Sequence, residues 1–275
     1  MNTKKGISIV EHFSRLSDPR QAHKTAHSLM DIMIVTICAV ICGADTWMDV
    51  QVFGRSKEKW LKTFLDLPNG IPSHDTFGRV FSLIDPNEFA TCFQAWIAAI
   101  TEQVKGVVAI DGKTVRRSFD SATGKSAIHM VSAWASDAGL VLGQRKTDSK
   151  SNEITAIPKL LELLALEGCI VTIDAMGCQK EIAQTILDRD ADYVLSLKGN
   201  QPGLYDEVYD IFQKAHESNF NGLTWSEYHS ENKSHGRQEK RHYWAIELSG
   251  ELERANEWPK LNAIVMVESI SQKAG

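Results

Sequence analysis

The spacing of apolar residues along the chain changes near residue 105. Before that point, apolar side chains recur every three or four positions, which is typical of amphipathic helices. Ser73 and Asn87 stand where the third and fourth of these helices begin, and both residue types favour the N-cap position. We therefore expect an all-α N-terminal domain over residues 1–103. Its predicted helices cover residues 27–42, 49–65, 73–84 and 87–104.

After residue 105, short apolar runs alternate with helical stretches. The order of strand, strand, strand, helix, strand, helix, strand, helix is typical of an α/β fold with an RNase H-like mixed sheet. In such a sheet the fourth strand lies beside the first. A β-rich insertion follows, so residues 104–275 form the second expected domain. The predicted strands cover residues 107–111, 127–136, 140–147, 169–174 and 192–200, the helices 152–168, 178–191 and 202–217, and the β-rich insertion 225–270.

Two strands that should be neighbours each end in an Ile-Asp pair. Asp111 follows the first buried strand and Asp174 follows the fourth. Ligands gather at the carboxyl ends of parallel strands, and paired carboxylates suit Mg²⁺ or Mn²⁺. Such a site can activate water or a 3′-hydroxyl against a phosphodiester. Two structural alternatives stay open: Asp111 in an Asp-Gly turn, and Asp174 as the cap of the next helix.

Positive charge gathers beside the first of these aspartates. The formal net charge of the chain is -5, which argues against a uniformly basic nucleic-acid binder. Residues 111–150 nevertheless hold seven Lys or Arg against four Asp. Lys113, Arg116 and Arg117 are candidate contacts to the phosphates of double-stranded DNA, and Arg237 in a second basic stretch is another. A solvated surface is the alternative for both stretches.

Other features of the sequence limit the cellular setting. The first residues contain no signal peptide, and the most apolar segment, LMDIMIVTICAVICGA, is short for a membrane span and carries an aspartate. The five cysteines form no C-x-x-C pair, which favours reduced thiols. No Gly-rich phosphate loop is present, so no nucleotide cofactor is expected. We expect a cytoplasmic protein that does not contact a membrane.

Several long motifs occur in an order that is similar to one protein family. The N-terminal motifs are DPRQAHKTAHSLMDIMIVTICAVICGADTW and LPNGIPSHDTFGRVFSLID. The motifs after residue 105 are AIDGKTVRRS, VTIDAMGCQKEIA, ADYVLSLKGNQPGL and HGRQEKR. Together they resemble the H-repeat-associated transposases of bacterial insertion sequences, a branch of the DDE transposases. The resemblance extends over nearly the whole chain.

The resemblance implies metal-dependent cleavage and transfer of DNA strands at the terminal repeats of a mobile element. Asp111 matches the first catalytic acid and Asp174 the second. The third acid of the family is a glutamate in a Trp-x-Ile-Glu-Asn helix after the β-rich insertion, and the sequence lacks that motif. We therefore expect a truncated copy with an incomplete catalytic domain and impaired activity.

Two other functions stay open at this point. One is a non-catalytic remnant that binds DNA or dimerises, and the other is an RNase H-like nuclease that cuts DNA without joining it. The N-terminal helices would serve either to recognise the terminal repeats or to form a homodimer, and the sequence does not decide between these roles.

Overall fold

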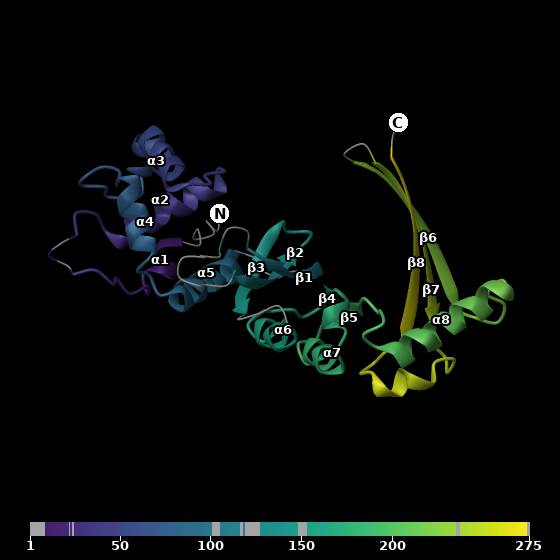
Figure 1. The fold of residues 1–275 in the computed structure, drawn as a ribbon. Coiled ribbons are helices and arrows are strands. Elements are labelled where there is room, and N and C mark those ends of the chain that lie inside the picture. Colours follow the sequence, from purple (N-terminus) through teal and green to yellow (C-terminus); the bar gives the residue numbers. More distant parts are fainter. Residues whose placement is uncertain are drawn as a thin grey trace, which may run out of the picture. The chain divides into compact units, whose positions relative to one another are not determined.

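The chain divides into two compact units, Met1–Gln103 and Val104–Gly275 (Figure 1). A computed structural model describes residues 9–21, 23, 25–100, 105–115, 118, 127–147, 153–234 and 237–273. Within those ranges, no helix combines the length and the hydropathy that crossing a bilayer requires.

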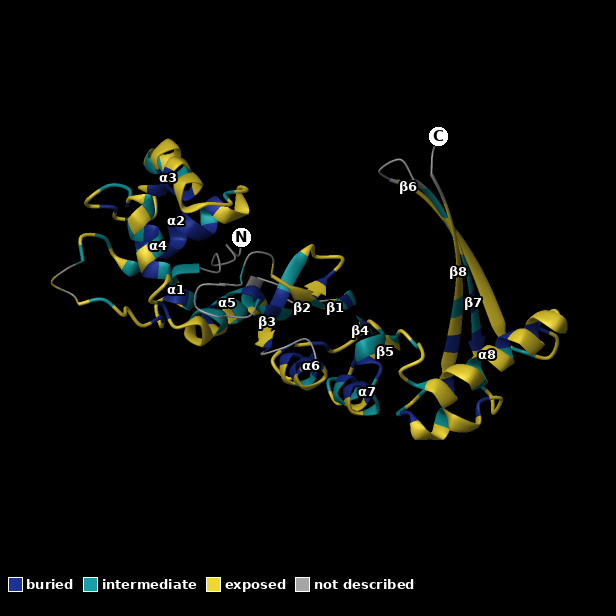
Figure 2. Cartoon of the chain, in the orientation of Figure 1, coloured by how far each residue is buried: buried dark blue, intermediate teal, exposed yellow. Residues whose placement is uncertain are grey.

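Five helices form the described part of the first unit. The central helix is α2, whose residues are buried along almost its whole length (Figure 2). It packs in a core that includes Phe13, Ile32 and Phe77. The ring of Phe13 contacts Phe89 at 5.6 Å and Trp96 at 6.5 Å between centroids, which links the first helix to the fifth. The helices are α1 (Ile9–Phe13), α2 (Leu29–Ile41), α3 (Trp47–Leu61), α4 (His74–Phe81) and α5 (Pro86–Ile100).

The N-caps of these helices partly follow the sequence prediction. Ser73 caps α4 as predicted. Helix α3, predicted over 49–65, begins before the predicted start, because Thr46 and Asp49 form a reciprocal capping box. The prediction for α5 was wrong: Asp85, not Asn87, is the capping residue. Its carboxylate accepts a hydrogen bond from the backbone N–H of Asn87 at 2.7 Å, and a proline then occupies the first helical position.

A five-stranded mixed sheet organises the first part of the second unit. Its strand order is β3-β2-β1-β4-β5. The pairs β1–β2 and β2–β3 are antiparallel, while β1–β4 and β4–β5 are parallel. The predicted sequence of elements and the placement of the fourth strand beside the first are confirmed. The elements are β1 (Gly106–Thr114), β2 (His129–Ala135), β3 (Leu140–Thr147), α6 (Glu153–Leu161), β4 (Cys169–Ile173), α7 (Lys180–Leu187) and β5 (Asp192–Leu195).

The two faces of this sheet differ in burial. Val108 and Ile110 of β1 are buried on the face that α6 and α7 cover. The intervening residues of β1 belong to the opposite face, because side chains alternate along a strand. On that opposite face Trp134, Ile170 and Val194 are all exposed. One face is therefore packed, and the other presents apolar side chains together with Asp111.

Several elements are shorter than predicted, and hydrogen bonding accounts for two of them. The helix expected over 152–168 ends at Leu161: the amide of Glu162 still bonds Pro158 four residues back, but those of Leu163 and Leu164 bond only three residues back. Its predicted cap, Asn152, lies outside the described residues. The strand expected over 192–200 ends at Leu195. Its partner β4 ends at Ile173, so the residues after Leu195 have no further residues of β4 to pair with.

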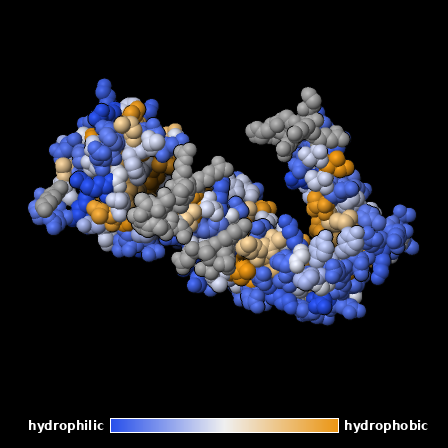
Figure 3. Space-filling model, viewed as in Figure 1, coloured by the Kyte–Doolittle hydropathy of each residue, from blue (hydrophilic) through white to orange (hydrophobic). Residues whose placement is uncertain are grey.

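The rest of the second unit is a long antiparallel sheet with a helix at its base. The strand order is β6-β7-β8. Phe212, Trp244 and Ile246 are buried where α8 covers one face of the sheet. On the opposite face of the same strands, Val265 and Val267 are exposed, and Figure 3 shows hydrophobic patches among these strands. The predicted β-strands within residues 225–270 are observed. The elements of this part of the chain are α8 (Pro202–Glu217), β6 (Trp225–Ser234), β7 (Arg237–Glu247), η4 (Glu253–Glu257) and β8 (Ala263–Lys273).

Candidate active site

Asp111 lies inside a strand, not at its end. Strand β1 continues past it to Thr114, paired residue for residue with β2, and Asp111 lies opposite Ser132. The Asp-Gly turn is therefore wrong, and so is the prediction that the strand ends at Asp111. On its other side, β1 pairs in parallel with β4, and this pairing ends at Ile110 and Ile173. Asp111 is the first residue beyond that pairing, and it is exposed.

Asp174 is the first residue beyond the same pairing on β4. Its backbone is still extended, and it caps the short helix η3 (Ala175–Gly177) by accepting the N–H of Met176 on Oδ1 at 3.1 Å. Asp174 thus has a capping role, but for η3 and not for the predicted next helix, since α7 has Gln179 at its N-cap. A carboxylate has a second oxygen, so this hydrogen bond does not prevent Asp174 from binding a cation.

The register brings these two aspartates next to each other. Asp111 and Asp174 each follow one member of the pair Ile110–Ile173, and both are exposed. Neighbouring strands lie about 4.8 Å apart, a spacing at which two carboxylates can reach one cation. Hard divalent cations prefer oxygen ligands, so this pair fits Mg²⁺ or Mn²⁺ in chemical type and in placement.

A buried polar cluster supports β1 directly beneath this position. Glu153, in the first turn of α6, is 4% exposed and is hydrogen-bonded to Nε2 of His129. The other ring nitrogen of His129 lies 2.9 Å from Thr114 Oγ1. A Cβ added at Gly112 would stand less than 3.0 Å from the Glu153 carboxylate, so only glycine leaves room for this contact. The cluster joins β1, β2 and α6 around the residue that follows Asp111.

Sequence reasoning missed this cluster. Gly112 was considered as part of a turn, and Glu153 stands where an acidic residue is ordinary in the first turn of a helix. The one available signal is a histidine at the start of a buried strand, His129, because a buried imidazole needs hydrogen-bond partners.

The structure places part of the predicted phosphate-binding set. Lys113 is exposed and lies two residues beyond Asp111 on β1, so both belong to the same face. The strand register places Lys146 on the same face as Lys113, because Met130 of β2 pairs with Lys113 of β1 on one side and with Lys146 of β3 on the other. Arg116 and Arg117 lie outside the described residues. Arg237 opens β7, and the structure describes its backbone only.

Two glutamates of the second unit, Glu207 and Glu239, have other partners. The carboxylate of Glu207 in α8 binds the backbone N–H of Glu253 and forms an ion pair with Arg254 at 3.7 Å. Glu239 binds Arg241 and the Ser269 hydroxyl on β7 and β8. The string WAIEL is similar in letters to the family's third motif, but it belongs to strand β7 and not to a helix. Glu207 and Glu239 thus each have a structural role where they stand.

The stretch that carries both aspartates matches a known family. Residues 102–261 match the family described as "Transposase DDE domain". The chain belongs to the DDE transposases. Residues 10–97 match the family described as "DDE_Tnp_1-associated", so the two matches together extend over most of the transposase.

Curated relatives agree with this assignment. "Putative transposase YncI" of Escherichia coli O157:H7 is 45% identical, over 97% of this chain and 68% of that protein. "H repeat-associated putative transposase YhhI" of Escherichia coli K12 is 43% identical, over 95% and 69%. An "Uncharacterized protein in dhlA 3'region" of Xanthobacter autotrophicus is 46% identical, over 94% and 86%. Their similarity confirms the predicted H-repeat relationship and the transposase function.

Proposed function

We propose that this transposase uses Asp111 and Asp174 to hold a divalent cation, Mg²⁺ or Mn²⁺, during cleavage and joining of DNA strands. The observation that carries the proposal is the register of β1 and β4, which ends at Ile110 and Ile173 and leaves an exposed aspartate next on each strand. DDE transposases as a family use divalent metal ions. The identity of the ion in this member is part of the proposal.

We further propose that the second domain, residues 104–275, has an RNase H-like fold. The support is the strand order β3-β2-β1-β4-β5, with an antiparallel pair on one side of β1 and a parallel pair on the other. Strand β1 is central in this order, and it carries the first aspartate. Strand β1 is paired on both sides up to Ile110, and Asp111 follows directly while still paired with Ser132 of β2, which defines its position.

The chain's own residues would divide the work in the following way. A bound divalent cation polarises the phosphoryl oxygens and lowers the pKa of the attacking hydroxyl. Asp111 and Asp174 fix the place where it binds. Lys113 and Lys146, exposed in one row across the sheet, hold the phosphate backbone beside that place. The cluster beneath Gly112 keeps β1 in register.

The proposed partner is double-stranded DNA at the terminal repeats of the mobile element. Arg116, Arg117 and Arg237 join Lys113 as proposed phosphate contacts. Phosphate contacts release counterions, so affinity for DNA should fall steeply with salt. Each cation removed by substitution should reduce the slope of log K against log salt by about 1.

A cleavage and joining assay tests this function. The DNA is a linear duplex that ends in the element's terminal repeats, with Mg²⁺ or Mn²⁺ added. We expect metal-dependent products that disappear in Asp111→Asn and in Asp174→Asn. The matched control is Asp192→Asn, which changes an exposed aspartate at the start of β5 in the same sheet. The control should retain the activity of the unmodified chain.

Other outcomes would select the alternative functions. Cleavage without joining, lost in the same two variants, would favour a nuclease. Salt-sensitive DNA binding with no cleavage would favour a non-catalytic DNA-binding protein. Products that persist in both Asp111→Asn and Asp174→Asn would show that the proposed site is wrong.

A further inference from the structure

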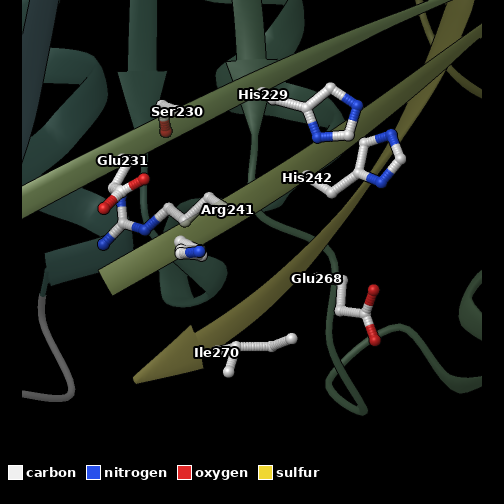
Figure 4. Close-up of a pocket in the computed structure, with 8 residues that line it drawn as sticks. His229, Ser230, Glu231, Arg241, His242, Glu268 and Ile270 are labelled. Carbon is white, nitrogen blue, oxygen red and sulfur yellow. The ribbon is translucent and has the colours of Figure 1, made fainter. Parts of the chain in front are cut away.

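A second group of metal-ligating side chains lies on the long sheet, away from both aspartates in sequence. Glu227 and His229 are two residues apart on β6, so they share one face of the strand. His242 on β7 lies directly opposite His229 in the antiparallel register. The three side chains therefore stand together on one face of the β6–β7 pair (Figure 4 shows the two rings side by side).

Their ligating atoms are close enough to share one ion. His242 Nε2 lies 3.0 Å from Glu227 Oε2, and His229 Nε2 lies 3.9 Å from the same oxygen. All three ligating atoms are within 4.8 Å of one another. Around a tetrahedral ion with bonds of about 2.0–2.1 Å, ligand atoms stand about 3.3 Å apart. The separations of 3.0 and 3.9 Å lie on either side of that value.

The imidazole rings are held in place by the core beneath them. The ring of His242 contacts Trp244 with centroids 3.6 Å apart and the planes tilted by 33°, and Trp244 is 8% exposed. The ring of His229 also contacts His242, again at 3.6 Å between centroids. Pre-positioned ligands lose less side-chain entropy when they bind. A single His–Glu hydrogen bond would account for His242, but it would not bring the second imidazole nitrogen toward the same carboxylate oxygen.

The ligand chemistry selects a class of ion. Two imidazole nitrogens and one carboxylate oxygen suit Zn²⁺, whereas Mg²⁺ prefers oxygen ligands alone. Three protein ligands leave a fourth position open. Both histidines line a hollow of about 350 Å³, which Glu268, opposite His242 on β8, also lines (Figure 4).

We propose that Glu227, His229 and His242 form a zinc-binding site that fastens β6 to β7. The bound ion would join the two strands that lead to the basic stretch around Arg237, and so hold that end of the sheet together. The site is separate from Asp111 and Asp174 in residues, in ligand type and in preferred ion.

The test is zinc binding to the complete chain after treatment with a chelator. Isothermal titration calorimetry with Zn²⁺ should give a site that His229→Ala, His242→Ala and Glu227→Gln each weaken about ten-fold or more. Zinc should raise the melting temperature of the unmodified chain, because it binds the folded state, and should do so much less in His242→Ala. All three positions are at least partly exposed, and circular dichroism checks that the variants fold.

Two matched variants separate this site from others. Glu239→Gln changes a glutamate on the opposite face of the same strands. Asp111→Asn removes an acid of the proposed catalytic pair. Both variants should bind zinc as the unmodified chain does. Cobalt(II) should give ligand-field bands without a sulfur charge-transfer band. Unchanged zinc binding in His229→Ala or His242→Ala, no zinc binding at all, or a thiolate band from cobalt would each overturn the proposal.

Discussion

The contact beneath the candidate active site makes a quantitative prediction for Gly112→Ala. The added Cβ would stand less than 3.0 Å from atoms of the Glu153 carboxyl group, a separation that real Cβ atoms do not tolerate. Glu153 cannot simply move away, because it is 4% exposed and bound to His129. Either α6 shifts from the sheet or the hydrogen bond to His129 breaks.

The expected loss of stability can be worked out from these two alternative responses. Overpacking of a filled interior costs about 1–3 kcal/mol. If instead the hydrogen bond breaks, leaving the buried histidine without its partner also costs about 1–3 kcal/mol. Replacing glycine in a strand by alanine offsets about 0.5–1 kcal/mol through lower backbone entropy in the unfolded chain. Either response therefore lowers the free energy of unfolding by about 1–2 kcal/mol, and we expect a loss of cleavage because β1 also carries Asp111.

The assay is urea unfolding followed by circular dichroism, with Gly199→Ala as the matched control. Gly199 has no atom within 4 Å of an added Cβ, so its substitution should have little effect. A double-mutant cycle identifies the cause, since Gly112→Ala should cost much less when Glu153→Ala has already made room. A loss below about 0.5 kcal/mol, or an equal loss in both backgrounds, would refute the reasoning.

Three further predictions concern the fold. Asp85→Ala should destabilise the first unit by about 1 kcal/mol through loss of the α5 cap, while Asn87→Ala should leave the melting temperature nearly unchanged. Leu160→Ala should cost about 2–5 kcal/mol in urea because its side chain is fully buried in α6, whereas Leu163→Ala, at an exposed position, should stay within about 0.5 kcal/mol. Burial raises the pKa of the Cys178 thiol from its usual 9.0 to about 11, so as the pH rises the unfolded chain loses this proton before the folded chain does. The free energy of unfolding should therefore fall between about pH 9 and pH 11. In unfolding curves measured over this pH range, Cys178→Ala should show a smaller fall.

The sequence predicted the order of elements because hydrophobic period and turn residues are local properties. The strand order around β1 followed from that pattern. The extent of β1 past Asp111 could not be predicted, since it depends on which residues of β2 stand opposite. The capping role of Asp85 was missed because Asn87 is an equally good cap on local grounds, and only the geometry of the chain decides between them.

Contacts between distant residues were harder to find. The Gly112–Glu153 contact joins residues on different elements, and neither local sequence predicts that they meet. The His229–His242 pair likewise depends on the register of β6 and β7. A shift of the register by one residue would place the two histidines on opposite faces of the sheet. In both cases local sequence identifies the residue types, while tertiary pairing decides whether they meet.

Binding of Mn²⁺ to the purified chain tests the central claim most directly. Electron paramagnetic resonance of free Mn²⁺ counts the bound ions, and a His242→Ala background removes the proposed zinc site. We expect a bound Mn²⁺ that is lost in Asp111→Asn and in Asp174→Asn but kept in Asp192→Asn. Equal Mn²⁺ binding in the unmodified chain and in both site variants would contradict the assignment of these two aspartates.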